Sequence, residues 1–132
     1  MTDNEKWLYD HGFRMSPCPF PYVFDEKDVW VLDCDLHGTR FCGIKGLEVC
    51  AMKVDVGGRE VWRGVAAYTP VYCKERVNAV VHHADSARGC VMKCVSDMLG
   101  WLQTDGREEQ RRMDATASAI SGFMYDVYEK GE

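Results

Sequence analysis

The chain has 132 residues, of which 46% are hydrophobic and 28% charged, and its formal net charge is −5 at pH 7. These values are typical of one globular domain and exclude an intrinsically disordered chain. The acidic balance opposes non-specific binding to nucleic-acid phosphates, and no apolar run is long enough to span a membrane. We therefore expect residues 1–132 to form a single α+β domain that does not bind membranes.

The chain contains seven cysteines, an odd number that does not fit a framework of paired disulfides. The segment Met1–Lys6 is polar and shows no export signal, so we expect a cytoplasmic protein whose thiols are reduced. A reduced cysteine packs as a small hydrophobic residue, and most of these cysteines are expected to do so.

The first expected element is a short helix. Thr2 and Glu5 have the spacing of a capping box, and Gly12 is a suitable residue to end the helix. Three prolines alternate with other residues in Ser16–Pro21, which predicts an extended loop that buries Phe20 and Tyr22 against the core. Residues 1–28 are thus expected to hold one helix and a proline-rich loop.

The middle of the chain has the two-residue alternation of strands. In Val29–Leu36 the alternation places Trp30 on one face and the carboxylates of Asp33 and Asp35 side by side on the other. A turn at residues 37–39 and a return strand over Arg40–Ile44 should follow.

A hairpin is the clearest local signal in the sequence. Strands are expected over Leu47–Val56 and Arg59–Tyr68, because the glycine pair between them suits a two-residue turn. The apolar run Val77–Val81 fits either a further strand or the start of a helix. The sequence therefore predicts an antiparallel sheet of three to five strands within residues 29–81.

Two C-terminal helices are expected within residues 85–129, the first of them capped by Asp85 or Ser86. Its apolar stripe is expected to be Cys90, Val91, Cys94, Val95, Met98, Leu99 and Leu102. The second helix should run from about Arg107 to Tyr128, with a stripe of Met113, Ala117, Ile120, Met124 and Val127.

No residue pattern identifies an enzyme or a metal site. Cys90 and Cys94 are four residues apart and His82 and His83 lie nearby, but the paired knuckles of structural zinc sites are absent. We expect no metal and no cofactor. Phosphate-binding loops, nucleophile elbows and dinucleotide fingerprints are also missing. A thiolate pair between one cysteine (Cys34, Cys42, Cys50 or Cys73) and His82 or His83 stays open, but a non-enzymatic protein is expected.

Acidic residues suggest a protein-binding surface, since the excess negative charge lies mainly in the first half of the chain. We expect a small binding protein that acts by occupying a protein partner. Proteins of this size and charge are common among phage and mobile-element accessory proteins, including inhibitors of host defence. The expected partner-binding residues are Trp30 as an aromatic anchor, with Asp25, Glu26, Asp28, Asp33 and Asp35; Trp62 is a second exposed aromatic in this interpretation.

The alternative is single-stranded nucleic-acid binding. Gly57–Trp62, Ala87–Val95 and Leu99-Gly100 together resemble the phage single-strand-annealing proteins of the Rad52-like group, in which a hairpin precedes a helix with small and basic residues. This partial resemblance covers less than half of the chain and implies annealing by an oligomeric ring. It also implies that arginines and lysines face the nucleic acid. The residues concerned are Arg63, Lys74, Arg76, Arg88 and Lys93.

Overall fold

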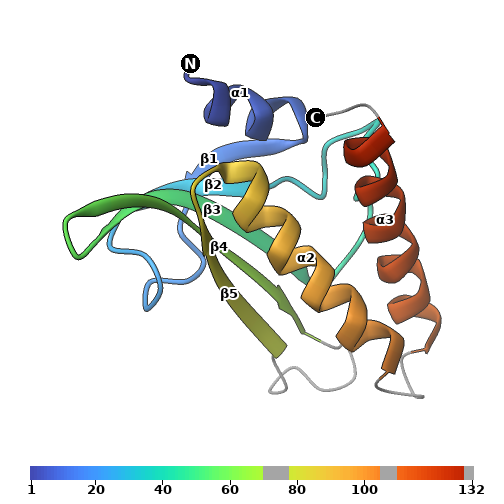
Figure 1. Cartoon of the computed structure of the whole chain (residues 1–132). Helices are drawn as coiled ribbons and strands as arrows, with labels where there is room; N and C mark the ends of the chain where they lie inside the picture. Colours follow the sequence, from blue (N-terminus) through green and yellow to red (C-terminus); the bar gives the residue numbers. More distant parts are fainter. Residues whose placement is uncertain (70–77, 105–109, 130–132) are drawn as a thin grey trace.

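The computed structural model describes residues 1–69, 78–104 and 110–129. The fold is α+β, and a five-stranded antiparallel sheet is followed by two C-terminal helices, as the sequence predicts (Figure 1). The strands follow one another in space in the order of the sequence. The elements are α1 (Asp3–Asp10), β1 (Phe13–Pro17), β2 (Asp28–Leu32), β3 (Leu47–Val56), β4 (Arg59–Tyr68), β5 (Asn78–Ala84), α2 (Ala87–Thr104) and α3 (Gln110–Glu129).

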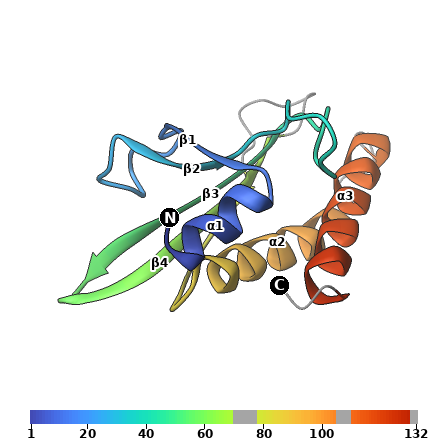
Figure 2. The same ribbon diagram turned by 90° about the horizontal axis from the view of Figure 1, so that it is seen from above.

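The helices all lie on one face of the sheet (Figures 1 and 2). Helix α2 crosses β3, β4 and β5, and both α1 and α3 contact α2. Gly64 allows α2 to come this close, because a Cβ atom at Gly64 would lie 3.1 Å from the carbonyl oxygen of Cys90. The predicted stripe of α2 forms this core: Cys90, Val91, Cys94, Val95, Met98 and Leu102 are buried, and Leu99 is partly buried.

A second apolar cluster covers the opposite face of the sheet. The loop between β1 and β2 folds over this face and places Phe24 against Val29, Cys50 and Val65. Phe20 and Val23 of the same loop are partly buried in this cluster. The strands in the middle of the sheet are therefore covered on both faces.

The predicted helix caps are confirmed. The Oγ1 of Thr2 accepts a hydrogen bond from the Glu5 N–H (3.2 Å), and the Thr2 N–H donates to Glu5 Oε1 (3.0 Å). This hydrogen bonding lowers the pKa of Glu5. At the start of α2, the Oγ of Ser86 accepts a hydrogen bond from the Gly89 N–H (3.0 Å), so Ser86 acts as the cap.

The predicted hairpin is also confirmed, with Val56 opposite Arg59 and Leu47 opposite Tyr68.

The sheet extends over more of the chain than the predicted residues 29–81. β1 (Phe13–Pro17) lies in the segment expected to hold only a helix and a loop, and it pairs with β2. Pro17 is compatible with this position because β1 is an edge strand and needs fewer hydrogen bonds. The ambiguous apolar run is a strand that ends at Ala84; Val77 lies outside the described residues.

The return strand expected over Arg40–Ile44 is wrong. Residues 33–46 form consecutive turns, in which the Ile44 N–H bonds to the Phe41 oxygen and the Gly43 N–H to the Cys34 oxygen. Gly38, Gly43 and Gly46 have φ values of 87°, 82° and 85°, which do not occur in a regular strand.

Helix α3 is confirmed from Gln110 onwards, and its predicted start near Arg107 lies outside the described residues. Ile120 and Val127 of its predicted stripe are buried, and Ala117 and Met124 are partly buried. Phe123 is a further core residue on this helix. Within the described part of the chain, no helix has both the length and the apolar character needed to cross a membrane.

Candidate functional site

The loop between β1 and β2 presents an exposed tyrosine beside carboxylates. The side chain of Tyr22 is 100% exposed, so the prediction that it is buried is wrong. Asp25 and Asp28 are also exposed, and Glu26 is half-buried, with one carboxylate oxygen that is buried and has no hydrogen-bond partner in the structure. We call Tyr22, Asp25, Glu26 and Asp28 the acidic loop.

Buried neighbours hold the acidic loop in place. Phe24 is 2% exposed, and the Val23 N–H donates a hydrogen bond to the Phe20 carbonyl oxygen (3.0 Å). At the base of the loop the Cys18 N–H bonds to the Lys27 carbonyl oxygen (2.9 Å). Tyr22 is thus an exposed ring on a backbone anchored on both sides.

Arg63 of β4 supports the same loop from the sheet. Its Nη1 donates a hydrogen bond to the Val23 carbonyl oxygen, and its Nε donates to His83 Nε2 (2.9 Å). This arginine was expected to contact nucleic acid. In the structure its hydrogen bonds go to the protein itself.

The other residues expected in an acidic partner-binding surface lie elsewhere. Trp30 is 6% exposed and packs in the core between the sheet and the helices, as does Trp62 at 4%. The interpretation of both as exposed anchors is therefore wrong. Asp33 and Asp35 do not share a strand face, because β2 ends at Leu32 and Asp33 Oδ1 accepts a hydrogen bond from the Asp35 N–H (2.9 Å). This is an aspartate turn, which competes with strand pairing.

Of the basic residues in the nucleic-acid alternative, Arg63, Arg88 and Lys93 fall in the described part of the chain, and each of them contacts another part of the protein. Arg88 is half-buried, with its Cζ 5.8 Å from the ring centroid of Tyr128 on α3. Lys93 is exposed, and its Nζ lies 3.4 Å from the His83 carbonyl oxygen at the edge of the sheet. Lys74 and Arg76 lie outside the described residues.

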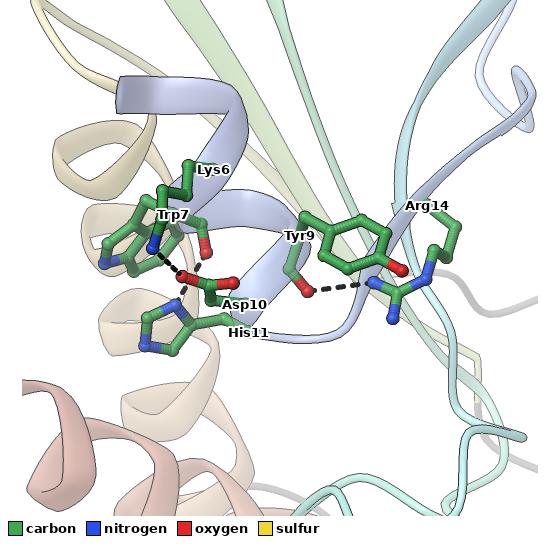
Figure 3. Close-up of polar contacts among 6 residues, drawn as sticks. All are labelled: Lys6, Trp7, Tyr9, Asp10, His11 and Arg14. Carbon is green, nitrogen blue, oxygen red and sulfur yellow. Dashed lines mark hydrogen bonds and ion pairs between the residues drawn. The ribbon is translucent and has the colours of Figure 1, made fainter. Parts of the chain in front are cut away.

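A hollow of about 560 Å³ lies between the end of α1, the turns after β2 and α3. Asp10 and His11 at the end of α1 line this hollow, and Figure 3 shows their contacts: Lys6 Nζ is 2.8 Å from Asp10 Oδ2, and His11 Nδ1 is 2.7 Å from the Trp7 carbonyl oxygen. The His11 ring also stacks on Trp7, with 4.3 Å between centroids. Nearby, Arg14 Nη1 donates to the Tyr9 carbonyl oxygen (2.9 Å).

The charged side chains that line this hollow are already paired, Asp10 with Lys6 and Arg40 with Asp126. Arg40 Nε and Nη2 bond to the two carboxylate oxygens of Asp126 at 2.9 and 3.1 Å, and these hydrogen bonds raise the pKa of Arg40. Arg40 lies close against α3, since a Cβ atom at Gly122 would be 2.9 Å from Arg40 Nη1. A ligand would have to compete with these ion pairs, so the hollow is better explained as part of the packing interface between α1, the turns after β2 and α3.

Four of the described thiols are poor nucleophiles because they are partly or fully buried, and Cys73 lies outside the described residues. Burial raises the pKa of Cys34 to about 11 and the pKa values of Cys90 and Cys94 to about 12, and it also raises the pKa of Cys50. The histidine near Cys42 is His37 (Sγ to Nδ1, 3.9 Å), and this pair lies in an exposed turn that no sequence pattern indicated as a site. In the described segments, no group of three or more His, Cys, Asp or Glu side chains is placed to hold a metal ion.

Alkylation should separate these thiols. At pH 8, iodoacetamide is expected to modify the exposed Cys42 at least tenfold faster than Cys50, Cys90 or Cys94, because thiolates react and burial suppresses thiolate formation. Peptide mapping by mass spectrometry measures the rates, and the chain in urea should label uniformly. Fast labelling of Cys90 or Cys94 in the folded state would contradict the buried placement.

In comparisons with known proteins, neither a family model, nor a curated protein, nor a solved structure matches this chain.

Proposed function

We propose that this protein is a non-enzymatic binding protein that uses the acidic loop to occupy the surface of a protein partner. The observation that carries the proposal is the fully exposed Tyr22 ring on an anchored loop. Tyrosine is enriched among the residues that dominate binding energy at protein interfaces. A loop that is already ordered also loses less entropy when it binds.

The charge around Tyr22 suggests what the partner looks like. Asp25 and Asp28 are exposed, whereas Lys27 is the one basic residue between Phe20 and Val29. A partner with a recess for an aromatic ring and a basic rim would match this surface. A small protein that covers such a rim would block the anionic ligands that bind there, so inhibition of the partner is the expected consequence.

Crosslinking from position 22 tests the proposal. A photoreactive phenylalanine at Tyr22 should crosslink to one protein of the native host, and the same substitution at Tyr125 should not. Tyr125 is a matched control because it is 63% exposed but lies on α3. The readout is the crosslinked mass on a denaturing gel and its identification by mass spectrometry.

The captured protein is then purified and titrated against variants. Tyr22→Ala is expected to weaken binding at least tenfold, which corresponds to about 1.4 kcal/mol. Asp25→Lys with Asp28→Lys should weaken it further and reverse its dependence on salt. Tyr125→Ala should bind like the unmodified protein. Equal affinity of the Tyr22→Ala variant would exclude the acidic loop as the binding surface.

A further inference from the structure

The outer edge of β5 is a second candidate binding surface, on the opposite side of the sheet from β1. We propose that β5 pairs antiparallel with β5 of a second copy of this chain, which joins two five-stranded sheets into one. The proposal is independent of the acidic loop and makes the protein a two-fold symmetric dimer.

The register of the hairpin shows which backbone groups of β5 point outward. Val56 and Arg59 flank a two-residue turn, so they exchange hydrogen bonds with each other. Because hydrogen bonding alternates along a strand, Gly64 of β4 bonds to β5, where it pairs with His82. The residues of β5 whose N–H and C=O groups consequently point away from the sheet are Ala79, Val81 and His83. The contact of Lys93 Nζ with the His83 carbonyl oxygen agrees with this assignment.

The two edges of the sheet differ in how they are protected. β1 ends in Pro17, which has no N–H group, and the Phe13 carbonyl oxygen accepts a hydrogen bond from Arg14 Nη1 (2.7 Å). β5 contains no proline, lysine, arginine or acidic residue, and Val81 at its centre is 44% exposed. Proteins normally block a free edge with charge or proline. β5 itself has neither, and the charge beside it, Lys93 of α2, contacts the His83 carbonyl oxygen near one end of the strand, so the centre of this edge is suited to pairing. Among the described residues no other strand pairs with this edge.

Symmetry favours a second copy of the chain over an unrelated strand. A two-fold axis through Val81 places this residue opposite the same residue of the second copy, and it places Ala79 opposite His83. The outward N–H and C=O groups of Ala79, Val81 and His83 then face the same groups of the second copy. No like charges of β5 face each other in this register. An isologous interface of this kind requires a surface that is complementary to itself.

The charges of α2 beside this edge have the required self-complementarity. Lys93 and Asp97 are exposed, and they reach over β5 to the His83 carbonyl oxygen and the His82 ring, respectively. The two-fold axis reverses the direction of α2, so the Lys93–Asp97 segments of the two copies run antiparallel beside the axis, and a pairing of Lys93 with Asp97 of the other copy is part of the proposal. Ser96 is exposed and small, and a Cβ atom at Gly100 would meet nothing within 4 Å, so neither position obstructs a second α2.

Sedimentation velocity measures the association directly. The unmodified protein should shift from monomer to dimer as its concentration rises through the micromolar range. Val81→Lys should raise the dimer dissociation constant at least tenfold, because two ammonium groups would face each other on the axis. Val56→Lys is the matched control, since Val56 is 47% exposed at the tip of the hairpin and should leave the dimer unchanged.

A charge exchange tests the symmetry separately. Lys93→Asp should weaken the dimer, and adding Asp97→Lys in the same chain should restore it, with circular dichroism to confirm that each variant folds. A protein that stays monomeric at all concentrations, a dimer insensitive to Val81→Lys, or a double variant as weak as Lys93→Asp would each overturn the proposal. Crosslinking from position 22 should persist in Val81→Lys, so failure of one proposal is distinguishable from failure of the other.

Discussion

Replacing Trp30 with alanine is expected to lower the free energy of unfolding by about 3 to 5 kcal/mol. The indole is 6% exposed, and it packs in the cluster that also holds Trp62 and the buried face of α2. Truncation would remove this burial and leave a cavity that neighbouring side chains fill only in part. Chemical denaturation monitored by circular dichroism gives the free energy.

Tyr22→Ala provides the matched comparison, because this side chain makes no buried contact that truncation would remove. It should change the free energy of unfolding by less than about 0.5 kcal/mol while it weakens partner binding. The two aromatics therefore separate stability from binding. A Trp30→Ala protein that stays fully stable but loses its partner would favour the role that the sequence predicted for Trp30.

Gly46→Ala is the second substitution with a large expected effect, a loss of about 3 kcal/mol or more. Gly46 has a φ of 85°, and a Cβ atom there would lie 2.5 Å from the Thr69 carbonyl oxygen. Its own carbonyl oxygen accepts a hydrogen bond from the Thr69 N–H (2.8 Å), which ties the start of β3 to the end of β4. A methyl group would strain the backbone and push these two segments apart.

Gly38→Ala isolates the contribution of the backbone angle. Gly38 has nearly the same φ, 87°, but nothing lies within 4 Å of a Cβ atom placed on it. Its replacement should cost about 1 to 2 kcal/mol, the strain of the left-handed conformation alone. Thermal unfolding of both variants gives the comparison. Equal losses would show that the close approach of Thr69 does not contribute.

The parts of the fold that the sequence predicted are those set by local rules. The hairpin depends on a glycine pair between two alternating runs, and both strands have the predicted bounds. Helix α2 depends on a cap and a regular apolar stripe. In contrast, β1 is short and ends in Pro17, so its pairing with β2 is a tertiary effect that no local pattern indicates.

The candidate site was harder to predict because alternation identifies which side chains share a face but not what covers that face. Trp30 was assigned to an exposed surface, although helices pack on its side of the sheet. One signal was available: Val29 and Val31, on the other side of the same strand, are also apolar, which is typical of a strand buried on both faces. The loop that covers that second face is the one that exposes Tyr22.

The tip of the β3–β4 hairpin projects beyond the helical layer in Figure 1, and residues 55–60 are all exposed. Cβ atoms at Gly57 and Gly58 would meet nothing within 4 Å. Insertions are best tolerated at such exposed turns, where few contacts are lost. An epitope or a fluorescent label between these two glycines would therefore report on the protein in cells while leaving both Tyr22 and the β5 edge accessible.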